Sequence, residues 1–221
     1  MLSHYGRQLA SAPLRYMVKL LRPTGITPNG LTLLGFVLTA ITAVFLASGR
    51  FVGGGILLII ASFFDMLDGA LARETKQAST FGAFFDSTLD RYSESVTFLA
   101  LAYYYLTGGA IGINVSANFA INTSETFSML IFLILVGSLM VSYTRARAEA
   151  LDVECKVGLL QRPERLVLLI VGLLVSGVMP VIWVVILWGM AVLTNITAFQ
   201  RIHEVYHQTR VGTQTSSQTD S

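Results

Sequence analysis

Apolar residues along the chain form long runs that are separated by short polar stretches. A helix needs about 20 mostly apolar residues to cross a hydrocarbon core of about 30 Å. Runs of this kind predict six spans, of which the fifth is short: residues 31–48, 52–72, 82–106, 126–148, 165–178 and 181–200. The pattern therefore predicts an all-α integral membrane protein with six transmembrane helices.

The two ends of the chain differ from this pattern. Residues 12–22 place basic side chains on one helical face and leucines largely on the other, which predicts an N-terminal amphipathic interfacial helix. After Gln208 the chain is rich in Thr, Ser and Gln, so we expect a disordered tail over residues 208–221. Residues 1–207 are then expected to form one membrane-embedded domain.

Composition narrows the possible functions. The chain is 53% hydrophobic and only 13% charged, with a mean hydropathy of +0.65, which excludes an ordinary soluble domain. Its net charge of +2, without basic stretches that alternate with aromatic residues, gives no indication of nucleic-acid binding. The single cysteine, Cys155, excludes an intrachain disulfide and a multi-cysteine metal site.

Lysine and arginine residues fall on alternating sides of the predicted spans. By the positive-inside rule, the N- and C-termini are cytoplasmic, and residues 108–125, which contain no Lys or Arg, face outward. Tyr103–Tyr105 and Trp183 are then expected at the outer interface, as an aromatic belt. We expect a multi-pass protein of the cell (plasma or inner) membrane.

Four aspartates lie inside predicted spans, where a carboxylate is costly. Asp65 and Asp68 share one helical face, as do Asp86 and Asp90, because residues three or four apart are neighbours on a helix. Antiparallel packing of the two spans would bring both pairs to similar depth, so we expect four carboxylates to converge on one point. Such a cluster needs cations, and its hard oxygen ligands suit Mg²⁺ or Mn²⁺ in a two-metal site for phosphoryl transfer.

The same residues carry a family resemblance. The pattern Asp65-x-x-Asp68-Gly69-x-x-Ala72-Arg73, followed by Gly82-x-x-x-Asp86-x-x-x-Asp90, resembles the complete signature of the CDP-alcohol phosphatidyltransferases. The resemblance implies transfer of a phosphatidyl group from a CDP-lipid to an alcohol, with release of CMP. It implies that Asp65, Asp68, Asp86 and Asp90 bind metal and that Asp90 is also the catalytic base. Asp65, Asp68, Gly69, Ala72, Arg73 and Gly82 would form the CDP-lipid side of the site.

A second motif precedes the first span. Thr27-Pro28-Asn29, with Thr32, resembles an element that lies near the nucleotide in many family members, which adds Pro28, Asn29 and Thr32 to the CDP-lipid set. The same residues also fit a simple helix start with Asn29 as the cap. The two interpretations are compatible.

The segment between spans four and five bears on the acceptor alcohol. Its cationic residues are what membrane orientation alone requires. However, its motifs also resemble those of bacterial phosphatidylinositol-phosphate synthases, which implies 1D-myo-inositol 3-phosphate (L-myo-inositol 1-phosphate) as the acceptor. On that resemblance the residues that hold the acceptor phosphate are Ser142, Arg145, Arg162 and Arg165.

Other functions stay open at this point. Glycerol 3-phosphate is the alternative acceptor, which would make the protein a phosphatidylglycerophosphate synthase. A small divalent-cation carrier would instead place intramembrane carboxylates on a polar path across the bilayer. A lipid-binding scaffold would have no need for Asp90 in addition to the metal ligands. The expected partners are CDP-diacylglycerol, a phosphorylated polyol and membrane lipids, and the resemblance implies a homodimer.

Overall fold

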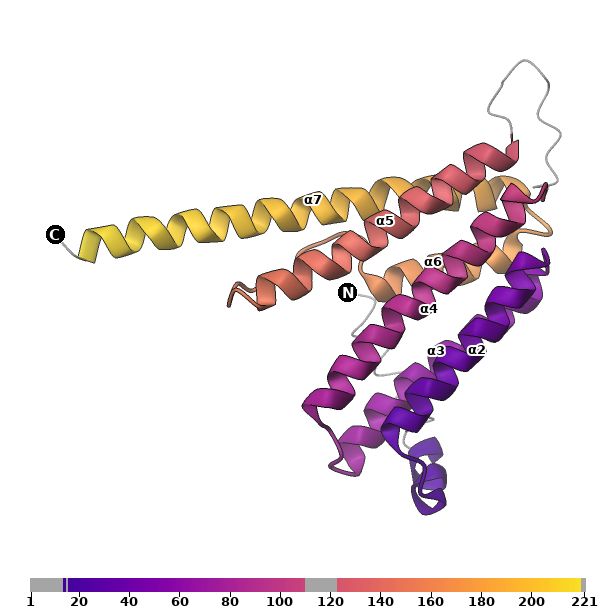
Figure 1. The fold of residues 1–221 in the computed structure, drawn as a ribbon, viewed down its shortest axis with the longest axis horizontal. Coiled ribbons are helices and arrows are strands. Elements are labelled where there is room, and N and C mark those ends of the chain that lie inside the picture. The colour runs from indigo at the N-terminus through magenta and orange to yellow at the C-terminus, as the bar shows by residue number, and fades with distance from the viewer. Residues whose placement is uncertain (1–13, 15, 110–122, 220–221) are drawn as a thin grey trace.

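The structure, a computed structural model, describes residue 14, residues 16–109 and residues 123–219. Every regular element in these ranges is helical, and none is a strand. A helical segment at residue 14 and residues 16–21 leads into a 3-10 turn, η1 (Arg22–Thr24). The longer helices shown in Figure 1 are α2 (Pro28–Ala47), α3 (Phe51–Glu74), α4 (Thr80–Leu106), α5 (Thr123–Glu149), α6 (Arg162–Val175) and α7 (Pro180–Thr219).

Four helices in the described part of the chain, α2, α3, α5 and α7, are long and apolar enough to cross a membrane. Helix α6 has only 14 residues, and α4 carries several charged side chains, among them Asp86, Asp90, Arg91 and Glu94. All-helical architecture with several apolar helices is thus confirmed. Length and composition thus support four spans in the described part of the chain. The two other predicted spans are α4, which carries charge, and α6, which is short.

The N-terminal segment packs on the bundle with its apolar face. Leu14 and Val18 are buried together with Leu31 of α2 and with Leu67 and Leu71 of α3. The segment therefore covers the ends of α2 and α3. Gly25, which follows η1, adopts a left-handed backbone with φ of 73°, a conformation that glycine accepts without steric cost.

The starts of α2 and α4 are fixed by hydroxyl caps. Thr27 is the N-cap of α2, and its Oγ1 accepts a hydrogen bond from the Gly30 N–H at 3.2 Å. The expectation that Asn29 caps this helix is wrong, because Asn29 already lies in its first turn. Ser79 caps α4 in the same way and accepts from the Gly82 N–H at 3.0 Å.

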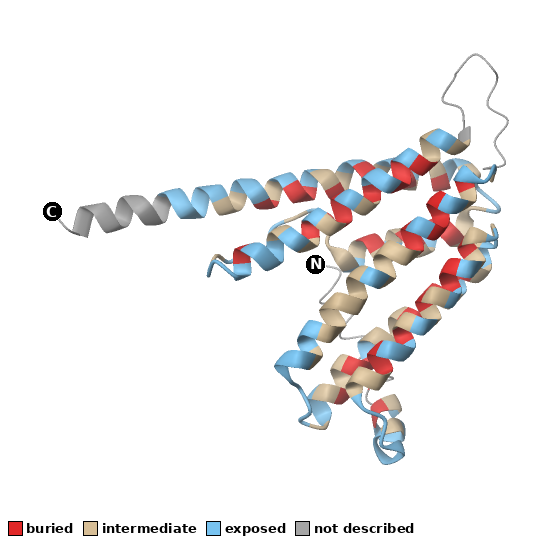
Figure 2. Ribbon diagram, in the orientation of Figure 1, coloured by how far each residue is buried: buried red, intermediate tan, exposed pale blue. Residues whose placement is uncertain are grey.

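The helices pack in a chain of neighbours. Helix α2 packs against α3 and α4, α4 against α5, α5 against α7, and α6 against α3 and α7. In Figure 1 the helices converge at the end that carries the α2–α3 turn and separate toward the end that carries the α3–α4 turn. Buried residues form one large core across α2 to α7, with faces that point inward (Figure 2).

The aromatic residues at the converging end belong to this core. Trp183 Nε1 donates to the Tyr105 hydroxyl at 2.8 Å, and both side chains are at most 1% exposed. Only Tyr103 of the expected aromatic belt is well exposed. Tyr105 and Trp183 therefore face the inside of the bundle, where their polar atoms satisfy each other, and their depth at the outer interface stays a prediction.

Helix α7 continues through Thr219, where the composition predicted a disordered tail after Gln208. Bonds within the helix support the extension: Gln208 Nε2 donates to Glu204 Oε1 at 2.7 Å, and Thr209 Oγ1 donates to the Val205 carbonyl at 2.9 Å. Adding a residue to an existing helix costs far less than starting a helix, so a long apolar helix can continue into polar sequence.

Candidate active site

The starts of α2 and α4 and the end of α3 enclose a cavity of about 220 Å³. Gly82 brings the elements close together, since a Cβ there would lie 3.2 Å from Asn29 Oδ1. Almost all of the predicted CDP-lipid residues line this cavity, together with one more aspartate: Pro28, Asn29, Thr32, Asp68, Gly69, Ala72, Arg73, Gly82 and Asp86. Because the CDP-lipid is the predicted donor of the phosphatidyl group, we call this space the donor cavity. Asp65 is the one member of the predicted set that lies elsewhere.

Asp68 is the least exposed to solvent of the four aspartates. The residue is only 5% exposed, and Thr32 Oγ1 donates to its Oδ2 at 2.6 Å. The Gly69 N–H donates to its other oxygen. Both oxygens of this buried carboxylate are thus hydrogen-bonded, as a buried charge requires.

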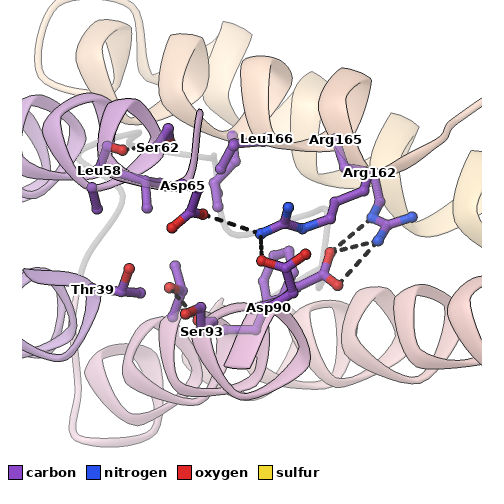
Figure 3. Close-up of a pocket in the computed structure, with 14 residues that line it drawn as sticks. Thr39, Leu58, Ser62, Asp65, Asp90, Ser93, Arg162, Arg165 and Leu166 are labelled. Carbon is purple, nitrogen blue, oxygen red and sulfur yellow. Dashed lines mark hydrogen bonds and ion pairs between the residues drawn. The ribbon is translucent and has the colours of Figure 1, made fainter. Parts of the chain in front are cut away.

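A second, smaller cavity of about 40 Å³ lies deeper in the bundle, between α3, α4 and α6. Asp65 of α3 and Asp90 of α4 line it, with Arg162 and Arg165 of α6 (Figure 3). Gly35 of α2 makes room for Asp65, because a Cβ at that position would lie 2.6 Å from Asp65 Oδ1. We call this space the inner cavity.

Arg162 joins the two aspartates of the inner cavity. Its Nη2 lies 3.3 Å from Asp65 Oδ2 and 2.5 Å from Asp90 Oδ1. Arg162 is the first residue of α6, so the start of that helix delivers a cation to carboxylates from two other helices (Figure 3). The aspartates thus occupy a place that already accommodates positive charge.

The four carboxylates form two pairs at successive depths in the bundle. Residues three or four apart on a helix lie about one turn, or ~5 Å, apart along its axis. Since α3 and α4 run in opposite directions, Asp65 lies level with Asp90, and Asp68 with Asp86. No group of three Asp, Glu, His or Cys side chains in the described ranges is arranged to hold a metal ion. Asp65 and Asp90 thus line one cavity and Asp68 and Asp86 the other, and the convergence of all four on one metal site stays a prediction.

The predicted acceptor residues are divided as well. Arg162 and Arg165 line the inner cavity, whereas Ser142 and Arg145 line neither that cavity nor the donor cavity. Arg145 is half exposed, and its Nε lies 2.8 Å from Glu149 Oε1 on the same helix. The structure thus brings two of the four residues to the aspartates.

Sequence reasoning missed Glu94, which also lines the inner cavity. Its two carboxylate oxygens accept from Arg165, at 2.8 Å from Nε and 3.0 Å from Nη2. Glu94 follows Asp90 by four residues, as Asp90 follows Asp86, so all three lie on one stripe of α4. That continued spacing is the signal that could have found it.

Comparisons with known proteins find similar sequences and similar folds. The family model described as CDP-alcohol phosphatidyltransferase matches residues 25–196. An archaetidylinositol phosphate synthase of Pyrococcus horikoshii is 34% identical over 207 residues, which cover 93% of this chain and 97% of that protein.

Two crystal structures of Mycobacterium tuberculosis phosphatidylinositol phosphate synthase share the fold. One, with manganese and citrate, has a TM-score of 0.77 at 30% identity and covers 87% of this chain and 88% of that one. The other, with CDP-DAG bound, has a TM-score of 0.76 at 31% identity and covers 87% and 93%. The chain, with its complete signature around two adjoining cavities, belongs to the CDP-alcohol phosphatidyltransferase family.

Proposed function

We propose that this membrane transferase moves the phosphatidyl group of CDP-diacylglycerol, or of a related CDP-lipid, to a hydroxyl of L-myo-inositol 1-phosphate. The products are phosphatidylinositol phosphate and CMP. The observation that carries the proposal is the adjacency of the donor cavity to an inner cavity in which a cation, Arg162, stands beside Asp90. The names of the related synthases support inositol phosphate as the acceptor.

The reaction needs a base, because a neutral hydroxyl is a poor nucleophile. In this proposal Asp90 takes the acceptor's hydroxyl proton while the hydroxyl oxygen bonds to the phosphatidyl phosphorus. The bond from that phosphorus to the oxygen of CMP breaks, and CMP leaves with the electron pair. A positioned carboxylate base typically contributes about 10²–10⁴-fold to the rate.

The donor cavity is the proposed site of the CDP group. Thr32 and Gly69 hold Asp68 in place through their hydrogen bonds. Gly82 keeps the cavity open where α2 and α4 approach each other. The residues proposed to bind the nucleotide and diphosphate are Pro28, Asn29, Thr32, Asp65, Asp68, Gly69, Ala72, Arg73 and Gly82.

The aspartates fit a divalent metal by their chemistry. Asp65, Asp68, Asp86 and Asp90 offer hard oxygen donors, and the guanidinium between Asp65 and Asp90 supports a preference for positive charge there. We propose that these four residues hold Mg²⁺ or Mn²⁺ in a two-metal site. Bound ions would neutralise the diphosphate and stabilise the charge on departing CMP.

Arg162 is the proposed primary ligand of the acceptor phosphate, because it is the cation nearest to the proposed base. A guanidinium suits this task, since its planar fork matches phosphate oxygens. Ser142, Arg145 and Arg165 stay predictions for the same role. Glycerol 3-phosphate also carries a phosphate, so the acceptor test must include it.

The surroundings of the inner cavity favour a transferase over a cation carrier. The cavity ends at Thr97 and Phe98 of α4. Beyond them Leu101 and Tyr105 are fully buried in the apolar core. A carrier would need a polar path to continue past this level.

For the whole protein we propose six spans in the cell membrane, with α4 and α6 added to the four apolar helices. Both termini would be cytoplasmic, and residues 1–207 would form one catalytic domain. Two copies would form a homodimer. The site would then open to the cytoplasm for the soluble acceptor and toward the bilayer for the lipid donor.

The test is CMP release from CDP-diacylglycerol by purified protein with Mg²⁺. Inositol 1-phosphate, glycerol 3-phosphate, free inositol and serine are compared as acceptors, and Asp90→Asn is the control. We expect turnover with inositol phosphate, and a loss of about 10²–10⁴-fold in kcat in the variant. Turnover with glycerol 3-phosphate alone would overturn the acceptor and keep the enzyme class. No turnover with any alcohol would favour the carrier or the scaffold.

A further inference from the structure

A second ion pair lies one helical turn beyond the aspartates. Glu94 accepts two hydrogen bonds from Arg165, at 2.8 and 3.0 Å. The Arg165 side chain is 1% exposed and that of Glu94 is 13% exposed. A paired, two-pronged contact of this kind fixes orientation as well as distance, because the planar guanidinium must face the carboxylate.

This pair bridges two helices that make little backbone contact. Helix α6 packs its backbone against α3 and α7. Two ion pairs link it to α4 at successive levels: Arg162 reaches Asp90, and Arg165 reaches Glu94. The second of these pairs, Arg165 with Glu94, thus ties α6 to α4 one helical turn beyond the aspartates.

Arg165 also holds the segment that leads into α6. Its Nη1 donates to the Leu160 carbonyl at 3.4 Å, and the Leu160 N–H donates to Thr197 Oγ1 of α7 at 3.0 Å. The backbone on both sides of Arg162 is thus tied down, toward α7 through Leu160 and toward α4 through Glu94. Arg162 lies between these two anchors.

We infer that Glu94 is a positioning residue of the site, which through Arg165 fixes the start of α6 so that Arg162 meets the phosphate of the acceptor. The inference rests on the proposed function in that Arg162 is taken as the acceptor ligand. This inference replaces the predicted direct role of Arg165: with its fork engaged by Glu94, Arg165 acts on the acceptor through Arg162 and not as a ligand of the phosphate. Glu94 thereby sets the affinity for a phosphorylated acceptor and leaves that for the CDP-lipid unchanged.

The variants must keep the charge balance, because removing one partner leaves an uncompensated buried charge. The first variant replaces both residues by amides, Glu94→Gln with Arg165→Gln. The second exchanges the charges, Glu94→Arg with Arg165→Glu, and so restores an ion pair. The control is Glu154→Gln, which breaks the exposed ion pair of Glu154 with Lys156 away from both cavities.

The measurements are KM for acceptor, KM for CDP-lipid, kcat and the thermal midpoint in detergent. We expect the amide pair to raise the acceptor KM about tenfold with a donor KM within about twofold of wild type, and the exchanged pair to recover most of the loss. The control should match wild type. An unchanged acceptor KM in a folded amide pair, equal shifts in both KM values, or no recovery in a folded exchanged pair would overturn the inference. Loss of folding in both variants would also overturn it, since the pair would then serve folding alone.

A third comparison separates this inference from the proposed function. In an Arg162→Gln background, the amide pair should cause no further rise in acceptor KM, because its effect passes through Arg162. Additive effects would contradict this. If wild-type enzyme prefers glycerol 3-phosphate, the proposed acceptor fails, and the same ratios measured with that acceptor still test Glu94.

Discussion

The four signature aspartates differ in what holds each carboxylate. Asp68 is buried with hydrogen bonds from Thr32 and Gly69, whereas Asp65 and Asp90 share the guanidinium of Arg162. Asp68 of the donor cavity is thus placed by neutral donors, and Asp65 and Asp90 of the inner cavity by a cation. Substitutions at the two cavities should consequently affect different substrates.

Thr32→Val tests the placement of Asp68. Valine keeps the shape of threonine but removes the hydroxyl that donates to Asp68 at 2.6 Å. Because hydrogen bonds to charged groups contribute about 1.5–3 kcal/mol, the free energy of unfolding should fall by a similar amount. The KM for CDP-lipid should rise while the acceptor KM stays near wild type.

Thr32→Ser is the matched control, since serine retains the hydroxyl. Thermal unfolding in detergent and the two KM values provide the measurement. If the valine and serine variants have the same donor KM, the hydrogen bond does not place Asp68 for the donor.

At the scale of elements, the apolar runs predicted the helices well. The span predicted over 52–72 is α3, Phe51–Glu74, and the one predicted from 82 begins at Thr80 because Ser79 caps it. The length of α7 was not predicted. The prediction relied on apolar residues that can be buried, whereas a long helix can continue into a polar sequence. The buried positions of Tyr105 and Trp183 depend on side chains from two helices meeting, which no single run encodes.

The candidate site was predicted to a similar extent. Its signature residues follow from spacing within α3 and α4, and all of them line one of the two cavities. The pairing of Asp65 with Asp90 through Arg162 could not be read from spacing, because it depends on how α6 packs against α3. Ser142 and Arg145 were grouped with Arg162 by motif, yet they line neither cavity.

Close packing between α5 and α7 depends on one glycine. A Cβ at Gly137 would lie 2.5 Å from Thr194 Oγ1 and 2.9 Å from Asn195 Nδ2, so Gly137→Ala must push the helices apart. Overpacking of this kind costs about 1–3 kcal/mol, and the thermal midpoint should fall. Gly189→Ala on α7 is the control, since nothing lies within 4 Å of a Cβ there. Equal midpoints for the two variants would contradict a tight α5–α7 contact.

At the scale of the whole molecule, the donor cavity lies at the end of the bundle that carries the α3–α4 turn, where the helices separate in Figure 1, and the inner cavity lies near the middle of α2, α3 and α4. The opposite end is closed by the aromatic contacts of Phe51, Tyr105 and Trp183. A soluble acceptor could therefore reach the aspartates only from the side of the bundle away from these aromatic residues. Under the proposed topology that side is the cytoplasm.

Cysteine labelling tests this orientation. With native Cys155 replaced by serine, single cysteines are placed in the exposed α2–α3 turn, as Ser48→Cys, and at the exposed end of α3, as Glu74→Cys. A membrane-impermeant maleimide should label position 48 from outside intact cells and position 74 only after the membrane is opened. Labelling of both positions from one side would contradict the spanning of α3.

The most direct test of the central claim follows the acceptor into the lipid product. Purified enzyme is incubated with CDP-diacylglycerol, Mg²⁺ and radiolabelled inositol 1-phosphate, and both CMP and label in the extracted lipid are measured. The account predicts one labelled lipid for each CMP released, with both lost in Asp90→Asn and in the presence of a chelator. Release of CMP without labelled lipid, or labelled lipid that forms equally well in the variant, would contradict it.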